Sequence, residues 1–366
     1  NARRFAVILD AKTKEVVQTL YIRERDSYHL EEEAEVRETL EQYGELTFSD
    51  ENGEDLTQSI TLNEGYALFP VPAIFANKGS DQRASVTVTG KAGSGKSFFV
   101  AQYVDAYHEA YPKNRVFYVS LNRIARDPSY EKLLKKVSFQ KVLQEVDPRK
   151  ITTSLDSGSF ENVLFIFDDI LDVEIPVCPV ILQRDYVKEK ENSYFEKEKA
   201  KVRTKEEKRK ELCERKGLPF RALSPEEMKA RIPVLENLEA TLMDQAVITR
   251  LNRVRSQHIR SCIHSTVENF LKNGRKYGIS VITTAHRLFD RNVTMNCAAD
   301  ESGLVVLFPY ANVSSEKLVE YLREKLCFDL SQARRVSSRT YKNYEFLAVN
   351  TTGRKFFYTS NYLEFL

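Results

Sequence analysis

Gly90-Lys-Ala-Gly-Ser-Gly-Lys-Ser97 fits the pattern GxxxxGK(S/T) at every position. Ser85-Val-Thr-Val-Thr89, with four β-branched residues, precedes it and predicts a strand, while residues 96–111 predict an amphipathic helix. Glycines let the backbone of such a loop fold tightly, so several N–H groups and the positive end of the helix face one anion. The sequence therefore predicts a phosphate-binding loop between a strand and a helix.

The loop also assigns roles to two side chains. Lys96 is expected to bridge the β- and γ-phosphates of ATP, and the hydroxyl of Ser97 is expected to bind Mg²⁺. ATP and Mg²⁺ are therefore the predicted cofactors. The residues predicted to surround the nucleotide are Gly90, Lys91, Ala92, Gly93, Ser94, Gly95, Lys96, Ser97 and Phe98.

A pair of acids follows a second apolar run. Val163-Leu-Phe-Ile-Phe167 predicts a buried strand, and Asp168 and Asp169 come directly after it. We expect Asp168 to support Mg²⁺ and Asp169 to act as the general base that orients the attacking water. An aspartate is one methylene shorter than a glutamate and must lie closer to that water, and the two roles could be reversed. The alternative is a strand that ends in a solvated acidic turn.

A third strand also ends in polar residues. Ile279–Thr284 predicts the strand, and Ala285-His286-Arg287 follows it. In ATPases with an extra strand between the phosphate-loop strand and the metal strand, a polar residue at this strand end senses the γ-phosphate. We expect His286 in that role, with Thr284 as the second candidate. The alternative is that His286 is an ordinary surface residue.

The remaining pattern of the middle of the chain alternates strands with helices. Residues 116–120 and 304–308 predict further buried strands, and residues 130–143 and 253–273 predict helices. Apolar runs bounded by helices are typical of a parallel sheet that is covered on both faces. The predicted fold class is therefore α/β, with a mostly parallel sheet of the kind that binds ATP.

The outer parts of the chain differ in character from this core. Short β-like runs separated by polar turns fill the first 80 residues, and an aromatic, strand-like stretch ends the chain. The predicted parts are a small α+β accessory domain at 1–80, a P-loop ATPase core at 81–180 and 246–340, a charged helical insertion at 181–245, and a β-like tail at 341–366.

The net charge of +2, from 55 Lys and Arg against 53 Asp and Glu, hides an uneven distribution. Residues 183–216 carry 13 basic and 9 acidic side chains, which leaves 42 basic and 44 acidic ones elsewhere. Residues 185–216 are nearly free of helix breakers and lack a continuous apolar face, which predicts a solvated helical arm. We hypothesise that its basic residues contact DNA phosphates; the alternative is a solubilising face on which the charges mostly cancel. The candidate contacts are Lys199, Lys201, Arg203, Lys205, Lys208, Arg209 and Lys210.

The composition excludes several classes of protein. A hydrophobic content of 42% with 11% aromatic residues can bury a sizeable core, which excludes wholesale disorder. No apolar run approaches the roughly 18 to 20 residues of a membrane span. The five cysteines include no CxxC pair, so neither a disulfide framework nor a zinc site is indicated, and a reducing intracellular compartment is expected.

Taken together, these motifs resemble the FtsK/HerA superfamily of DNA-pumping ATPases. The resemblance covers residues 84–175 and 250–340. It depends most on Gly274-Arg-Lys-Tyr-Gly-Ile-Ser280 and on the Thr-Ala-His-Arg ending at 284–287. With the paired acids at 168–169, these motifs look most like the genome-packaging ATPases of large eukaryotic DNA viruses and their small relatives.

The resemblance implies more than the residues alone. It implies a RecA-like core of the additional-strand class that assembles as a homo-oligomeric ring, with double-stranded DNA through its centre. It also implies an arginine supplied in trans to the γ-phosphate of the neighbouring subunit. Arg275 is the first candidate, and Arg253, Arg255 and Arg287 are the alternatives. For a viral protein, capsid or portal-like partners, a host cytoplasmic or nuclear assembly site and presence in the virion follow.

Two departures from the family pattern leave other functions open. His286 stands where cellular DNA translocases have glutamine, and residues 176–250 look like an insertion beyond the usual core. The expected function is an ATP-driven DNA translocase, most simply a viral genome-packaging motor. The alternatives are a non-packaging helicase or recombination ATPase, and a nucleotide-regulated scaffold or assembly factor without motor activity.

Overall fold

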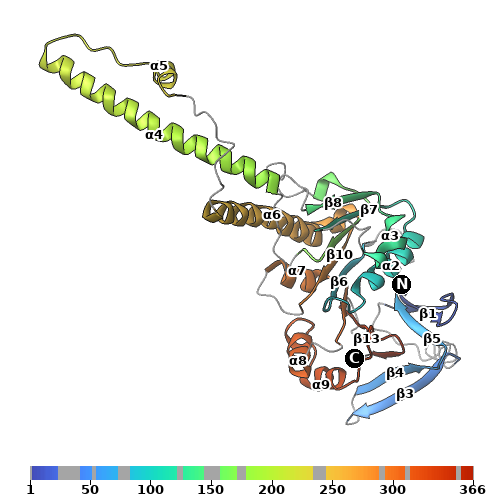
Figure 1. The fold of residues 1–366 in the computed structure, drawn as a ribbon. Helices are drawn as coiled ribbons and strands as arrows, with labels where there is room; N and C mark the ends of the chain where they lie inside the picture. The colour runs from blue at the N-terminus through green and yellow to red at the C-terminus, as the bar shows by residue number, and fades with distance from the viewer. Residues whose placement is uncertain are drawn as a thin grey trace. The chain divides into compact units, whose positions relative to one another are not determined.

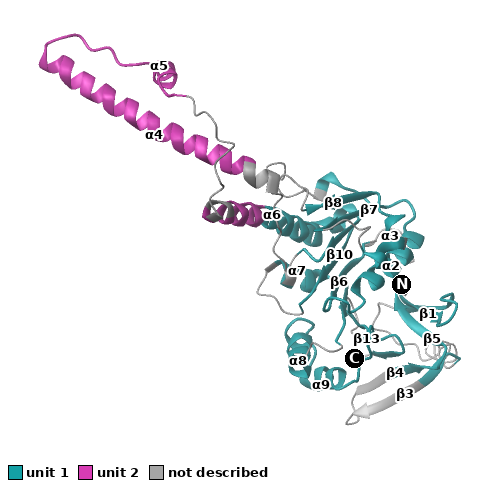
Figure 2. Ribbon diagram, viewed as in Figure 1, with its two compact units in different colours: residues 1–144, 151–175, 259–366 teal, residues 145–150, 176–258 magenta. Residues whose placement is uncertain are grey.

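The chain forms two compact units (Figure 2). The first unit takes residues 1–144, 151–175 and 259–366, and the second takes residues 145–150 and 176–258. The computed structural model describes residues 2–23, 42–51, 55–72, 83–121, 127–143, 157–170, 179–233, 245–287, 293–309, 314–351 and 356–365.

Parallel strands form the centre of the first unit (Figure 1). These strands are β6 (Ser85–Thr89), β7 (Arg115–Ser120), β8 (Phe139–Val142), β9 (Val163–Asp168), β10 (Ile279–Ala285) and β11 (Leu304–Leu307). Their order across the sheet is β11-β6-β10-β9-β7-β8, and every neighbouring pair is parallel. All seven residues of β10 and the first five of β9 are buried, as expected for strands that are covered on both faces.

The position of β10 identifies the class of fold. It lies between β6, which leads into the phosphate loop, and β9, which ends in the acidic pair. Such an extra strand is the feature expected of the additional-strand ATPases. The predicted α/β fold with a RecA-like P-loop core is therefore confirmed.

Helices cover this parallel sheet. Helix α2 (Lys96–Ala110) follows the phosphate loop, and the C-terminal part of α6 (Gln245–Asn273) buries Ile259, Ile263, Val267 and Phe270 at spacings of three and four residues. The ring of Phe270 lies 4.6 Å from that of Phe165 in β9, between ring centroids. This apolar face fixes α6 on the sheet. The smaller helices are α7 (Val293–Glu301), α8 (Ser315–Glu324) and α9 (Leu330–Ser337).

The predicted helix over 130–143 is wrong. The structure has a 3-10 turn, η2 (Pro128–Tyr130), a single helical turn, α3 (Glu131–Leu134), and then strand β8. Strand β8 pairs with the edge of β7, and the ring of Phe139 packs 5.6 Å from that of Phe117. Pairing with a strand that lies more than 20 residues earlier overrides the local preference for helix.

Antiparallel strands extend the sheet beyond β11. The tail folds into β12 (Leu347–Asn350), β13 (Phe356–Tyr358) and β14 (Tyr362–Phe365), and β14 pairs with the hairpin of β3 (Gly44–Glu51) and β4 (Asp55–Leu62). Among the described residues the sheet thus has eleven strands, in which the N-terminal and C-terminal parts of the chain lie side by side (Figure 1).

A second sheet packs onto the same core. Strand β1 (Ala2–Asp10) lies between β2 (Val16–Arg23) and β5 (Tyr66–Pro70), and all pairs are antiparallel. The ring of Phe5 lies 4.7 Å from that of Phe356 in β13, so this sheet and the main one share one hydrophobic core. The described strands among the first 72 residues therefore pack within the first unit, and the predicted domain boundary at residue 80 stays a prediction.

The second unit is built around one long helix, α4 (Pro179–Arg215). Gly217 ends it with φ 61°, and the chain turns back into α5 (Pro225–Ala230), which begins with a capping box between Ser224 and Glu227. The returning segment touches α4 where the N–H of Leu223 donates to Oε1 of Glu206 at 3.1 Å. We call residues 179–233 the α4 hairpin. None of the described helices has the length and hydrophobicity of a membrane span.

Candidate functional site

The phosphate loop requires glycine at specific positions. Gly93 and Gly95 have φ angles of 75° and 103°, which other residues rarely adopt. At Gly90 the limit is space, because an added Cβ atom would lie 2.7 Å from Oγ of Ser94 and 2.8 Å from Cβ of Phe308. The loop is therefore folded as tightly as the sequence pattern predicts.

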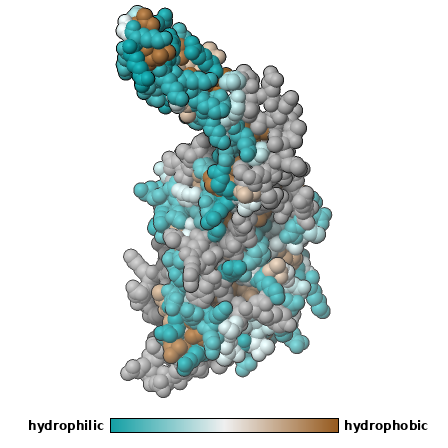
Figure 3. Space-filling model, turned by 60° about the vertical axis from the view of Figure 1, so that its left-hand side comes forward, coloured by the Kyte–Doolittle hydropathy of each residue, from teal (hydrophilic) through white to brown (hydrophobic). Residues whose placement is uncertain are grey.

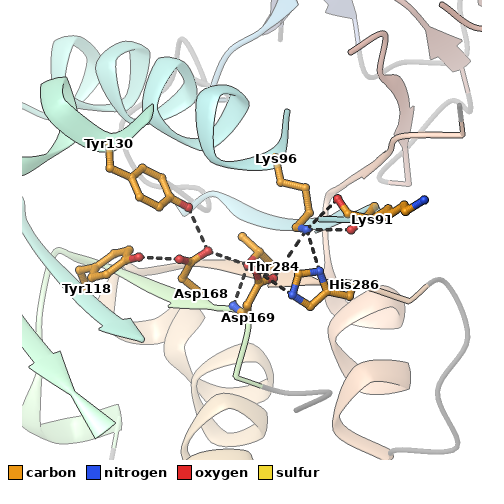
Figure 4. A network of polar contacts seen from close by, with 9 residues as sticks. Lys91, Lys96, Tyr118, Tyr130, Asp168, Asp169, Thr284 and His286 are labelled. Atoms are coloured by element: carbon orange, nitrogen blue, oxygen red, sulfur yellow. Dashed lines mark hydrogen bonds and ion pairs between the residues drawn. The ribbon is translucent and has the colours of Figure 1, made fainter. Parts of the chain in front are cut away.

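Lys96 lies at the centre of the site, and only 5% of it is exposed. Its ammonium group donates to the carbonyl oxygens of Gly90 at 2.7 Å and Lys91 at 3.3 Å (Figure 4). It also lies 3.2 Å from Nδ1 of His286 and 3.8 Å from Oδ1 of Asp169. The side chain expected to hold phosphates thus bonds to its own loop and to the ends of β9 and β10.

His286 links Lys96 to Asp169. The lysine ammonium can only donate, so Nδ1 of His286 is the acceptor in a neutral ring, and Nε2 carries the proton. That Nε2 lies 3.1 Å from Oδ2 of Asp169, and this carboxylate oxygen accepts the hydrogen bond. The three residues form a directed chain of hydrogen bonds from the first residue of α2 to the neighbouring ends of β10 and β9 (Figure 4).

Asp168 is held by three hydroxyl groups. Tyr118 donates to its Oδ2 at 2.5 Å, and Tyr130 and Thr284 lie 2.9 Å and 2.8 Å from its Oδ1. Burial, followed by the charge of neighbouring Asp169, raises the pKa of the Asp168 carboxyl, and the three hydroxyls offset only part of that rise. Burial and the negative charge of Asp168 also raise the pKa of both tyrosines, so the phenols stay protonated donors.

Asp169 lies in a different electrostatic environment. Its φ of 50° turns the chain at the end of β9, and its N–H donates to Oγ1 of Thr284 at 2.8 Å. Burial alone would raise the pKa of its carboxyl, but the hydrogen bond from His286 and the charge of Lys96 outweigh it and lower the pKa. Two adjacent carboxyls therefore have pKa values shifted in opposite directions, a pattern typical of sites that need two different roles.

The residues fit ATP and Mg²⁺. Ser94 Oγ is buried and has no hydrogen-bond partner among the described residues, so the loop holds an unsatisfied polar group where a phosphate is expected. The hydroxyl of Tyr130 bonds to both Ser97 and Asp168, which brings the two predicted Mg²⁺-associated residues to one place. A hydroxyl and a carboxylate are oxygen ligands of the kind that Mg²⁺ prefers.

Most of the predicted catalytic residues come together, and Arg275 does not. The polar network joins Lys96, Asp168, Asp169 and His286 at the C-terminal ends of the parallel strands. Arg275 is exposed and precedes the N-terminal end of β10, about 20 Å away along that strand by its length. It therefore cannot reach the phosphates of its own subunit.

The alternative arginines differ in position. Arg255 bonds to Oδ2 of Asp185 at 2.9 Å, and that carboxylate is 5% exposed, so Arg255 is held within the second unit. Arg253 is exposed on α6, and Arg287 is exposed directly after His286. The assignment of the trans arginine stays a prediction.

Sequence reasoning missed Tyr118 and Tyr130. Tyr118 alternates with Val116 and Ser120 as a buried residue of β7, which looks like ordinary core packing. Its hydroxyl meets Asp168 because β7 and β9 pair in register, with Ser120 opposite Asp168. The sequence before Tyr130 contains an Asp-Pro pair, which indicates a turn. That pair does not indicate that Tyr130 contacts Asp168.

The comparisons with known proteins give structural neighbours only. No protein family matches the sequence, and no curated protein does. A similar solved structure is the genome packaging NTPase B204 from Sulfolobus turreted icosahedral virus 2 in complex with AMPPCP, with 12% identity, a TM-score of 0.36, and 78% of this chain and 99% of that chain covered.

Two further solved structures are similar in the same way. The pCW3 conjugation coupling protein TcpA has 10% identity and a TM-score of 0.33 over 88% of this chain and 92% of that chain. VirB4 of Thermoanaerobacter pseudethanolicus has 12% identity and a TM-score of 0.33 over 87% and 96%. All three are P-loop ATPases of the FtsK/HerA superfamily that the sequence motifs resemble. Because the TM-scores lie below 0.5, the assignment of the site rests on the strand order and the side chains described above.

Proposed function

We propose that this chain is an ATP-driven translocase of double-stranded DNA that pumps a viral genome into a capsid. The observation that carries the ATPase part is the hydrogen-bonded chain from Lys96 through His286 to Asp169. It lies at the ends of β6, β10 and β9, next to a glycine-rich loop that a strand and a helix enclose. This arrangement supports phosphoryl transfer from ATP to water.

ATP binding changes the partners of Lys96. Phosphate oxygens compete with the carbonyls of Gly90 and Lys91 for its ammonium group, and charge favours the phosphates. As Lys96 turns toward the triphosphate, Asp169 loses a cation 3.8 Å from its Oδ1. The carboxylate becomes more basic as a result, so Asp169 is the strongest base when the nucleotide is bound.

Asp169 then orients the attacking water. Its oxygen accepts a proton from the water, the water oxygen forms a bond to the γ-phosphorus, and the bond from that phosphorus to the β–γ bridging oxygen breaks. ADP and phosphate are the products. His286 holds Asp169 through Nε2 and lies near Lys96 through Nδ1, so it is placed to respond when the γ-phosphate leaves.

Asp168 and Ser97 would hold Mg²⁺ near the phosphates. The bound ion would neutralise charge that builds up on the phosphate oxygens. Tyr118, Tyr130 and Thr284 keep the Asp168 carboxylate in one orientation.

A ring explains the position of Arg275. The residue precedes the N-terminal end of β10, at the edge of the sheet opposite its own phosphate loop, so Arg275 can reach a γ-phosphate only in a neighbouring subunit. Head-to-tail contacts between identical subunits produce rings when the rotation closes. A homo-oligomeric ring with the duplex through its centre is therefore part of the proposal.

The α4 hairpin offers a second surface for DNA. Its basic residues are not evenly spread, because a row of exposed side chains recurs at spacings of three, four and seven residues along one side of the helix. We call this row the lysine row. Its members are Lys190, Lys197, Lys201, Lys205, Lys208 and Arg215.

The other sides of α4 are different. Glu189, Glu196, Glu207 and Glu214 each precede a member of the lysine row by one residue, which places them about 100° around the helix. The returning segment covers a third side, where the ring of Phe220 lies against Arg209. Figure 3 shows hydrophilic residues over most of the α4 hairpin. The lysine row thus presents positive charge in one direction, as contact with a line of phosphates requires.

Hydrolysis and DNA coupling are tested together. We expect wild-type protein to hydrolyse ATP in the presence of Mg²⁺, and long duplex DNA to raise the rate several-fold, whereas Lys96→Ala abolishes hydrolysis with or without DNA. Retained hydrolysis by Lys96→Ala contradicts the site. Hydrolysis that DNA does not stimulate favours a scaffold or assembly factor, and stimulation by single strands or forks favours a helicase.

A further inference from the structure

An exposed aromatic side chain lies beside the phosphate loop. A Cβ atom built on Gly95 would lie 3.5 Å from Cδ1 of Tyr344 and 3.4 Å from Cε1 of Phe308. Phe308 is buried, whereas 65% of Tyr344 is exposed. Tyr344 therefore packs against the loop on one side and leaves most of its ring open to solvent.

The backbone of Tyr344 is held in an unusual conformation. Its φ of 66° lies in the left-handed region, which aromatic residues rarely adopt. Two hydrogen bonds close the turn around it: the N–H of Glu345 donates to the carbonyl of Lys342 at 3.1 Å, and the N–H of Lys342 donates to Oε2 of Glu345 at 2.8 Å. Backbone strain that presents an exposed ring at a binding loop points to a function for that ring.

The strand order decides which end of a nucleotide reaches Tyr344. Asp169 and His286 follow β9 and β10, on one side of β6, so the terminal phosphate belongs on that side. Tyr344 precedes β12, which lies beyond β11 on the other side. Leu347 at the start of β12 pairs with Leu307 at the end of β11, so Tyr344 lies at the same edge of the sheet as the phosphate loop.

A nucleotide with its γ-phosphate at Asp169 therefore extends its base toward Tyr344. We propose that Tyr344 stacks on the base of the bound nucleotide, a role that rests on the proposed function. Every nucleobase has a π-face, and stacking on an aromatic side chain strengthens binding about 10-fold as judged by alanine substitution. The triphosphate stays with Lys96 and the loop, so the base and the phosphates make separable contributions to affinity.

Two probes separate these contributions. Calorimetric titrations compare a non-hydrolysable ATP analogue with inorganic tripolyphosphate, both with Mg²⁺. We expect Tyr344→Ala to bind the analogue about 10-fold more weakly than wild type and tripolyphosphate equally well. Tyr344→Phe keeps the ring and is expected to bind both probes like wild type. Equal affinity of wild type and Tyr344→Ala for the analogue overturns the proposal, and so does equal weakening for both probes, because it indicates a distorted loop.

A fluorescent variant gives an independent readout. The chain contains no tryptophan, so Tyr344→Trp carries a single indole at this position. We expect the ATP analogue to quench its fluorescence and tripolyphosphate to leave it unchanged; an unchanged signal with both probes overturns the proposal.

An exposed tyrosine in the three-stranded sheet, which does not include β6, provides the control. Tyr21 in β2 is 59% exposed, and Tyr21→Ala is expected to bind both probes like wild type. Wild-type protein that binds no nucleotide contradicts the proposed function itself. Wild-type protein that binds the analogue no better than Tyr344→Ala contradicts only the role of Tyr344.

Discussion

Nε2 of His286 lies 3.1 Å from Oδ2 of Asp169, and Nδ1 of the same ring lies 3.2 Å from the ammonium group of Lys96. One imidazole thus contacts both the residue proposed to bind phosphate and the residue proposed to orient water. We expect His286→Ala to lower kcat about 10- to 100-fold, because Asp169 loses the donor that holds it. Nucleotide affinity should change little, since the loop is intact.

Glutamine at position 286 is the matched control for this prediction. Its amide can donate to Asp169 and accept from Lys96, as the imidazole does. His286→Gln should therefore retain more of the wild-type kcat than His286→Ala. Steady-state ATPase rates at saturating ATP and Mg²⁺ check the order, and a wild-type kcat in His286→Ala would exclude a role for the ring in hydrolysis.

The adjacent acids should respond oppositely to the same substitution. The pKa of Asp168 is raised, so the stability that this group contributes is complete below the ordinary carboxyl pKa and is lost as pH rises through the raised value. At neutral pH the buried charge of Asp168 costs stability, and Asp168→Asn should raise the Tm by about 1–3 °C. Asp169 has a lowered pKa, so its contribution is present at neutral pH and is lost as pH falls through that value; Asp169→Asn should lower the Tm.

Thermal unfolding at pH 7.5 without nucleotide or Mg²⁺ measures both shifts. The two differences from wild type should shrink as the pH approaches about 4, where the unfolded-state carboxyls become protonated. Tm shifts of the same sign in the two variants would show that the two carboxyls share one environment. Both variants should lose hydrolysis, because each removes a charged oxygen from the site.

The phenol of Tyr118 should tune the acid limb of the pH–rate profile. Its hydrogen bond to Oδ2 of Asp168 lowers the pKa of that carboxyl, which burial otherwise raises. Tyr118→Phe removes the donor, so the pKa of Asp168 should rise further and the acid limb of ATPase activity should move to higher pH. Tyr103→Phe is the control, because Tyr103 is also buried and the hydroxyls that bond to Asp168 are those of Tyr118, Tyr130 and Thr284. An unmoved acid limb in Tyr118→Phe would contradict the role of this hydrogen bond.

Local patterns predicted the parts of the site that lie within one element. Lys96 follows a glycine-rich loop, and Asp169 and His286 each follow an apolar run. The sequence therefore predicted where the strands end and that these ends lie at one edge of a parallel sheet. Tyr118 and Tyr130 could not be found in this way, because they meet Asp168 only through the register of β7 with β9 and the turn beside α2.

Strand β8 shows the same limit for the fold. Its four residues carry too short a pattern to outweigh helix propensity, and its partner β7 lies in an earlier part of the chain. The predicted DNA-binding cluster shows it too, since the sequence alone put seven basic residues in one group. Helical geometry separates three of them, Lys201, Lys205 and Lys208, which lie in the lysine row, from Lys199, Arg209 and Lys210, which lie on other sides of α4 and each pair with an acid of the same helix. Lys201 also pairs with Glu198, at 2.6 Å.

That division allows the DNA contact to be tested with two variants that have the same net charge. Lys197, Lys205 and Lys208 belong to the lysine row, and no ion pair joins them to another described residue. Replacing all three by glutamine should weaken duplex binding and lower the slope of log affinity against log salt by about 2–3, since each phosphate contact contributes about 0.9. Fluorescence anisotropy with a labelled duplex at several salt concentrations measures the slope.

The control removes the same number of charges from the other sides of α4. Lys199, Arg209 and Lys210 pair with Glu196, Glu206 and Glu214 at 3.3, 3.7 and 3.9 Å. Acidic residues of the same helix already pair with these three basic side chains. Replacing the three basic residues by glutamine should therefore change the salt slope much less than the lysine-row variant does. Equal slopes in the two variants would show that DNA senses only the total charge of the hairpin. A lysine-row variant with unchanged DNA affinity and a smaller particle size would instead assign the row to contacts between subunits.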